Sequence, residues 1–230
     1  MTKKINKRTF HIIQTILSII YIPVTILIFT ISLLPGLLIS IFLHTYFILD
    51  NIFFQSFFYA FSISFTYIIF GLTQLFLISL IYIVFPFKIK EGTYHFRSTM
   101  CLKWAFNSSL LKLVKFTFLD FVTPSFINIL FFKMLGANIG KNVQINTIRI
   151  SDPWLLSIDD NSMIGGSANI NGHSFENNTM IFQKVKIGKN ATIGASSIVW
   201  QNTSIGDNST LASMSLLLKG SVIPDNQIWA

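Results

Sequence analysis

The sequence predicts a two-part chain, in which an N-terminal α-helical membrane anchor is followed by an all-β parallel β-helix. The N-terminal half contains two long stretches without a charged side chain, at positions 9–49 and 51–87. In the C-terminal half an aliphatic residue recurs at every sixth position from Ile181 to Ile223, and such a hexapeptide repeat is typical of a parallel β-helix. The composition divides in the same way, since only two of the 24 Phe but nine of the 12 Gly lie beyond residue 135.

We expect residues 1–87 to form the membrane anchor, with two transmembrane helices at about 11–34 and 57–85. Both uncharged stretches exceed the roughly 20 apolar residues of a spanning helix. They also exceed the apolar core of roughly 7–15 residues in a cleavable signal peptide. The adjacent Pro35 and Gly36 are expected to end the first span. Residues 37–54 are left open as an interfacial helix, a re-entrant segment or a third span.

Basic residues flank the two spans. Lys3, Lys4, Lys7 and Arg8 precede the first span, and Lys88, Lys90, Arg97 and Lys103 follow the last. Positively charged flanks stay on the cytoplasmic side, which favours a multi-pass protein of the cell (inner) membrane with a cytoplasmic β-helix. The net charge of +8 is therefore assigned to contact with anionic membrane lipid and not to nucleic acid. The single cysteine, Cys101, excludes an internal disulfide and a cysteine-based zinc site.

The rest of the chain is divided between a linker and the repeat. Residues 88–134 are predicted to form a juxtamembrane amphipathic helical linker that lies at the membrane surface, packs on the β-helix, or does both. The hexapeptide-repeat β-helix is assigned to residues 135–230. Its period breaks after Ile145 and again after Ile170, so a loop or an irregular corner lies at each of these places. The second interruption contains His173, and a loop that interrupts a regular scaffold commonly carries function.

Several motifs point to a known superfamily. The segment LGANIG at 135–140, the Ile-Gly hexapeptides and the histidine in the loop resemble the hexapeptide-repeat acyltransferases. The segments 92–104, 151–166 and 172–176 resemble the membrane-bound C-terminal unit of poly-amino-acid synthetases and related adenylation-linked proteins. The resemblance implies a left-handed parallel β-helix, a homotrimer, and acetyl-CoA or another acyl-CoA as co-substrate between neighbouring copies. The family usually ends on Trp-x-Gly-x-Pro-Ala, whereas this sequence stops at residues 228–230, so we expect the C-terminal cap to be missing.

Acyl transfer needs a base for the acceptor's proton, and the sequence offers one candidate. His173 is the only histidine in the β-helix half, and an imidazole can accept a proton at neutral pH. A purely structural role is the alternative. We expect Glu176 to orient the imidazole, with Asp152 and Asp159 as the other carboxylates that are able to do so.

The late rungs of the repeat are expected to bind the co-substrate. Ser197 and Ser213 are small enough to let a pantetheine arm pass closely, and Lys189 and Lys219 are candidate contacts for its phosphates. Trp200 is assigned to stacking on adenine, with packing between subunits as the alternative. No metal site and no tightly bound cofactor are predicted.

Two functions remain open at this point. The first is a membrane-tethered acyltransferase that acts on a hydroxyl or amine acceptor at the cytoplasmic face, with membrane lipid and acyl-CoA as partners. The second is a catalytically silent assembly or export module of a membrane-bound peptide or polysaccharide biosynthetic complex. A β-helical carbonic anhydrase does not fit, because one histidine in this half cannot supply three zinc ligands.

Overall fold

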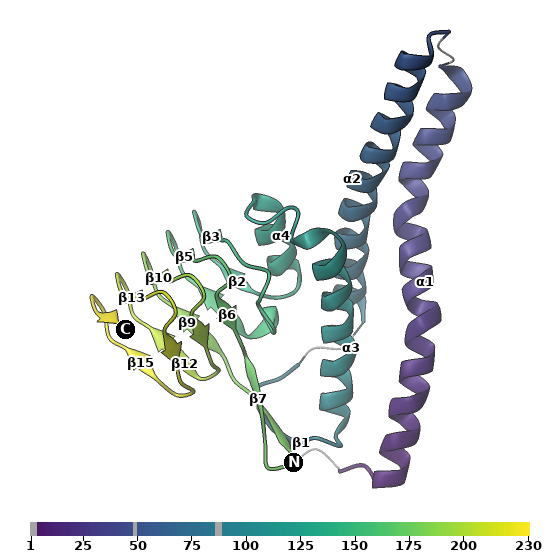
Figure 1. Cartoon of the computed structure of the whole chain (residues 1–230). Coiled ribbons are helices and arrows are strands. Elements are labelled where there is room, and N and C mark those ends of the chain that lie inside the picture. Colours follow the sequence, from purple (N-terminus) through teal and green to yellow (C-terminus); the bar gives the residue numbers. More distant parts are fainter. Residues whose placement is uncertain (1–3, 48–49, 86–88) are drawn as a thin grey trace.

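The computed structural model describes residues 4–47, 50–85 and 89–230. Two long helices, α1 (Lys7–Tyr46) and α2 (Ile52–Val84), pack against each other as a hairpin. A middle region of helices and one strand follows, and a stack of short parallel strands completes the chain (Figure 1). This order confirms the predicted fold class of apolar helices followed by a parallel β-helix.

Both long helices are apolar enough and long enough to cross a membrane. With 40 residues in α1 and 33 in α2, they extend over about 60 and 50 Å. The helix α1 continues through Pro35 and Gly36, so the predicted break there is wrong. A Cβ at Gly36 would lie 2.9 Å from Thr66 Cγ2, and the Thr66 hydroxyl donates a 3.2 Å hydrogen bond to the Gly36 carbonyl. The glycine therefore allows the two helices to approach closely, and residues 37–46 continue the first helix.

The middle region links the long helices to the strands. It contains β1 (Gly92–His95), α3 (Thr99–Val114), the π-helical turn η1 (Lys115–Leu119) and α4 (Phe126–Met134). A Cβ at Gly71 of α2 would lie 2.0 Å from Cγ of Phe118, so only glycine fits there. Helix α4 covers the first coil of strands, where Phe132 is fully buried and the Asn128 side-chain amide donates 2.9 Å to the Ile145 carbonyl. One apolar core therefore runs from the long helices into the β-helix.

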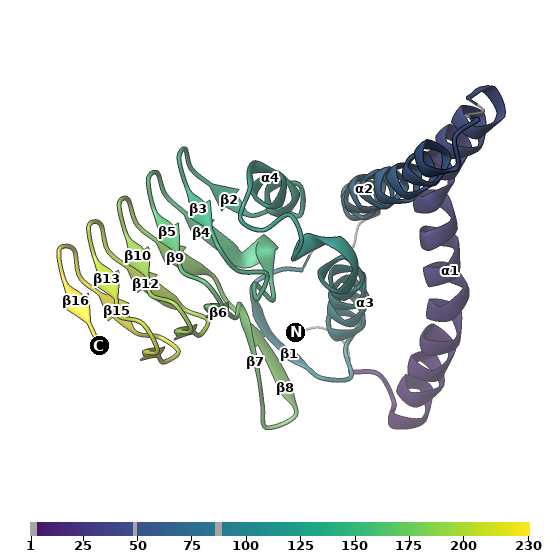
Figure 2. The same cartoon turned by 45° about the horizontal axis from the view of Figure 1, so that its top comes forward.

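The β-helix has three parallel sheets, which we call faces 1, 2 and 3. Face 1 contains β2 (Asn138–Ile139), β4 (Leu156–Ile158), β9 (Val185–Ile187), β12 (Thr203–Ile205) and β15 (Val222–Ile223). Face 2 contains β3 (Gln144–Ile145), β5 (Met163–Ile164), β10 (Thr192–Ile193), β13 (Thr210–Leu211) and β16 (Ile228–Trp229). Face 3 contains β6 (Asn169–Ile170), β11 (Ile198–Val199) and β14 (Leu216–Leu217). Figure 2 shows the coils stacked side by side, with α4 next to β2 and β3.

Each regular coil carries the chain once around the three faces, so that Thr192 pairs with Thr210 directly above it. The aliphatic residues of the six-residue repeat point inward and are at most 2% exposed: Ile187, Ile193, Val199, Ile205, Leu211, Leu217 and Ile223. Burial of each such side chain stabilises the fold by about 1.5–3 kcal/mol. Each aliphatic residue of the six-residue repeat is therefore the inward-facing residue of one side of a coil.

The corners between faces have a distinct conformation. The residue three positions after each aliphatic residue has a positive φ: Asn190, Ser196, Asn202, Asn208, Met214, Gly220 and Asn226. Asparagine is frequent there because it tolerates the left-handed region better than most residues. The Asn190, Asn208 and Asn226 side chains also form a ladder, with hydrogen bonds of 3.0 and 3.2 Å. The small residue at the next position, such as Ala191, is buried inside the coil.

Two insertions interrupt the coils. The first coil is one position longer than a regular coil, because Gln144 pairs with Met163 whereas Thr192 pairs with Thr210. The second coil is much longer, because Met163 pairs with Thr192. Its inserted residues form a hairpin of β7 (His173–Glu176) and β8 (Thr179–Phe182), with β1 as the third strand beside β8. Ile181 pairs with Thr93 of β1; its assignment to the six-residue wall is wrong, and the uninterrupted wall begins at Ile187.

Candidate active site

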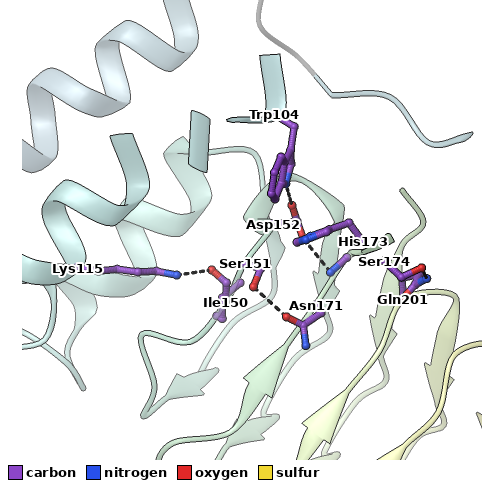
Figure 3. Close-up of polar contacts among 10 residues, drawn as sticks. Trp104, Lys115, Ile150, Ser151, Asp152, Asn171, His173, Ser174 and Gln201 are labelled. Carbon is purple, nitrogen blue, oxygen red and sulfur yellow. Dashed lines mark hydrogen bonds and ion pairs between the residues drawn. The ribbon is translucent and has the colours of Figure 1, made fainter. Parts of the chain in front are cut away.

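The two insertions meet at one corner of the β-helix. The hairpin leaves the corner where the chain passes from face 3 to face 1, which we call corner 3–1, and His173 is its first residue. Asp152 belongs to the irregular first coil, directly before the short 3-10 helix η2 (Pro153–Leu155). A Cβ at Gly172 would lie 2.9 Å from Asp152 Cβ. Glycine before the histidine thus allows the two insertions to come together (Figure 3).

His173 and Asp152 form a hydrogen-bonded pair. The Nδ1 atom of His173 lies 2.6 Å from Oδ2 of Asp152, whose side chain is fully buried. Asp152 also accepts hydrogen bonds of 3.0 Å from the Gly172 backbone N–H and from the indole N–H of Trp104. Two fixed N–H donors thus address Asp152, and a carboxylate can only accept hydrogen bonds, including the one from His173. Nδ1 therefore carries the proton, and Nε2 has a free lone pair.

A cavity of about 210 Å³ opens beside the imidazole, between α3 and the β-helix. It is lined by Trp104, Ser108, Leu111, Lys112, Lys115, Ser151 and His173. Within the described residues, no side chain or backbone group hydrogen-bonds Nε2 of His173. The imidazole thus borders this cavity, and none of these groups competes for its Nε2.

Lys115 is the most enclosed cation of this cavity. Its Nζ donates a 2.9 Å hydrogen bond to the Ile150 carbonyl (Figure 3). Burial lowers the pKa of Lys115 to about 8, and the negative charge of Asp152 partly opposes this shift. Neither Lys115 nor Trp104 received a function from the sequence, because both come from the linker and meet the β-helix only through the fold.

Glu176 does not orient the imidazole. It accepts a hydrogen bond of 2.7 Å from the Ser174 hydroxyl and pairs with Lys219 at 2.6 Å. The hydrogen bonds from Lys219 and then from Ser174 hold its pKa below the usual value. Side chains alternate between the two sides of a strand, so Glu176, three residues after His173 on β7, points away from it. The carboxylate at the imidazole is that of Asp152, one of the expected alternatives, while Asp159 lies at a different corner.

The predicted co-substrate contacts do not form one surface within a single chain. Ser197 is buried, and its hydroxyl donates 2.7 Å to a backbone carbonyl of its own corner, so it is not available to a ligand. Ser213 is exposed at the same corner, between faces 2 and 3, and Lys189 is exposed between faces 1 and 2. Only Trp200 and Lys219 lie at corner 3–1, where the hairpin emerges.

The comparison with protein families identifies the repeat. Residues 184–219 match the model of the family described as bacterial transferase hexapeptide (six repeats). This match lies within the hexapeptide repeat that the sequence predicted for residues 135–230. A delta-poly-L-ornithine synthetase of Acinetobacter baumannii (strain AB307-0294) is 29% identical over 69 residues. That match covers 30% of this chain and 5% of the synthetase, so the chain spans only a small part of its relative's length.

Solved acetyltransferase structures are distantly similar. A maltose O-acetyltransferase from Clostridium difficile 630 has 17% identity and a TM-score of 0.46, with 61% of this chain and 88% of that chain covered. A galactoside acetyltransferase in complex with coenzyme A has 20% identity and a TM-score of 0.44, with 60% and 81% covered. We assign the β-helix from this chain itself: its strands pair in parallel, and each regular coil pairs with the next at the same offset in sequence.

Proposed function

We propose that the chain is a membrane-tethered acyltransferase with His173 as the general base. It transfers an acyl group from acetyl-CoA or a similar thioester to a hydroxyl or amine acceptor at the cytoplasmic face. The observation that carries the proposal is the pair of the buried Asp152 and the partly exposed His173 beside a cavity. The bacterial transferase repeat over residues 184–219 supports the reaction class.

The reaction follows from the free lone pair on Nε2. The acceptor's O–H or N–H gives its proton to Nε2 of His173 while its oxygen or nitrogen attacks the thioester carbonyl carbon. The C–S bond then breaks, and the leaving thiolate takes the proton from the imidazolium. Asp152 touches no reacting atom; it is a positioning residue that holds the tautomer and stabilises the imidazolium. General base catalysis of this kind contributes about 10²–10⁴-fold in rate.

Exposed apolar side chains support tethering to a membrane. Both long helices expose apolar residues along most of their length. In addition, four large apolar residues of η1, α4 and the turn between them are more than half exposed: Phe116, Phe121, Phe126 and Leu130. Apolar surface of this extent is typical of contact with lipid. The basic residues at the ends of the helical hairpin favour a cytoplasmic β-helix.

The co-substrate is proposed to lie along corner 3–1. Trp200 and Lys219 are retained as its contacts, because they share this corner with the hairpin that carries His173. Lys189 and Ser213 lie at other corners and would contact the same molecule only from a second copy. The homotrimer that the resemblance implies would provide such a copy.

Turnover by a histidine variant tests the proposal. His173→Ala should lower acetyl-CoA turnover, measured as release of free CoA in the presence of mixed hydroxyl and amine acceptors, by about 10²-fold or more. His11→Ala, on the exposed face of α1, is the matched control and should leave turnover unchanged. Equal turnover by folded His173→Ala protein would reject the base assignment.

The same preparations distinguish an enzyme from the silent assembly or export module. A ligand that binds only the folded state raises the melting temperature. Acetyl-CoA should therefore raise the melting temperature of the wild type and of His173→Ala alike. No shift with acetyl-CoA or several other thioesters would favour the silent module.

A further inference from the structure

The cavity beside His173 has two chemically different walls. The β-helix contributes Ser151 and His173, and α3 with η1 contributes the remaining lining residues, including two lysines. Its volume of about 210 Å³ is below the range of about 300–1,000 Å³ typical of drug-sized ligand pockets. The cavity therefore fits a small molecule or the head group of a larger one.

The two lysines of this cavity have no acidic partner. Among the residues that the structure describes, neither Lys112 nor Lys115 forms an ion pair with a carboxylate. The ammonium of Lys115 has three donors, of which the Ile150 carbonyl takes one. Asp152 is already held by three other donors. Enclosing a cation without a partner is costly, and the lowered pKa of Lys115 reflects that cost.

A third polar group on the same wall has no hydrogen-bond partner among the described residues. The hydroxyl of Ser108 is buried, and it has no hydrogen-bond partner in the described part of the chain. Ser108 lies one helical turn from Trp104 and from Lys112, so these three side chains share one face of α3. The hydroxyl of Ser108 and the side chains of both lysines thus line a cavity whose described lining residues offer them no carboxylate. The Lys112 ammonium lies 5.7 Å from the ring centroid of Phe116, a contact that leaves its hydrogen-bond donors open to an anion. An anionic ligand would satisfy all three.

We propose that this cavity binds an anionic group of the acceptor, a carboxylate or a phosphate, through Lys112, Lys115 and Ser108. The acceptor is then a small molecule, or a head group, that carries this anion close to its hydroxyl or amine. The anion fixes the acceptor against α3 and directs its nucleophile to Nε2 of His173. The catalytic part of this inference depends on the proposed acyl transfer, whereas the anion binding itself does not.

Three probes with the same short amine skeleton test the binding. The full chain in phosphatidylcholine nanodiscs is titrated with β-alanine, O-phosphoethanolamine and propylamine, and binding is followed by saturation-transfer NMR. At least one anionic probe should bind about tenfold tighter than propylamine, the effect of one additional charge-assisted hydrogen bond. The tighter of the two anionic probes distinguishes a carboxylate from a phosphate. Competition by phosphatidic acid placed in the nanodisc would identify a lipid phosphate as the source.

Lysine variants locate the binding. Lys115→Met and Lys112→Gln should each remove most of the preference for the anionic probe. Lys112 is exposed, so its variant tests the proposal even if Lys115→Met does not fold. Lys133→Gln, which changes an exposed lysine of α4 outside the cavity, should keep the preference. Equal binding of all three probes, or a preference that survives both cavity variants, would overturn the proposal.

The outcomes separate this inference from the proposed function. His173→Ala should retain the anionic preference while losing turnover. Lysine-dependent anion binding in a wild type without acyl transfer would leave the anion site standing and reject the enzyme. Acyl transfer that is equally fast to acceptors with and without an anionic group would leave the enzyme standing and reject the anion site.

Discussion

Replacement of Asp152 by Asn should impair the proposed base function of His173 without removing the histidine. Asp152 accepts from three fixed donors, the Trp104 indole at one oxygen and the Gly172 N–H and His173 Nδ1 at the other. If the new amide NH₂ group occupies the first position, it opposes the indole N–H and leaves His173 beside a neutral amide oxygen, which stabilises the imidazolium less than a carboxylate does. If it occupies the second, it opposes the Gly172 N–H and turns His173 into the tautomer with the proton on Nε2. That tautomer cannot accept a proton from the acceptor.

The size of both effects follows from this geometry. One buried donor left without an acceptor costs about 1–3 kcal/mol of stability. Loss of general base catalysis costs about 10²–10⁴-fold in rate, or about 2.7–5.4 kcal/mol in activation free energy. The assay compares kcat/KM for CoA release at neutral pH with the melting temperature of the same sample. Asp159→Asn makes the same change at an exposed corner and should change neither. Turnover by folded Asp152→Asn within about threefold of the wild type would refute the reasoning.

Three further outcomes are expected. Burial lowers the pKa of Lys115 from 10.5 to about 8, so between these values the unfolded chain binds more protons and the free energy of unfolding rises with pH. Denaturation across this pH window should show that rise in the wild type and not in Lys115→Met; an identical rise in both would contradict the shift. Glu176→Gln should keep turnover within about threefold of the wild type, because Glu176 contacts Ser174 and Lys219 and not His173; a loss as large as that of Asp152→Asn would return the orienting role to Glu176. Met214 is 84% exposed with φ 62°, so Met214→Asn should raise the free energy of unfolding by up to about 1 kcal/mol in chemical denaturation, and no gain would count against the account of the corners.

The repeat could be predicted because each side of a coil needs one buried aliphatic side chain. That requirement leaves a period in the sequence, and Ile187 to Ile223 follow it without exception. The same period misassigned Ile181, which happens to lie six residues before Ile187 but belongs to the hairpin. Its antiparallel pairing with Thr93 of β1 and Ser174 of β7 separates it from the repeat, and such pairing leaves no six-residue period in the sequence.

The site could be predicted only in part, for a related reason. His173 was identifiable because it is a lone histidine in an interruption of the repeat. Asp152 was only one of three carboxylates, since its place depends on the course of an irregular coil. Trp104 and Lys115 reach the site from the linker, with Trp104 contacting Asp152 across 48 positions of sequence. Glu176 is only three residues from His173 in sequence, but side chains alternate along a strand, so the two lie on opposite sides of β7.

The three-stranded sheet of β1, β8 and β7 makes the two halves of the molecule inseparable. β1 is the next element after the second apolar helix in the sequence, and among the described residues it is the only strand that pairs with the other side of β8. A soluble fragment that begins at residue 135 would keep every coil of the β-helix. It would nevertheless lose the strand that supports the hairpin and the indole that holds Asp152. The middle region is thus a structural component of the proposed site, and transplanting the β-helix alone would leave behind both β1 and Trp104.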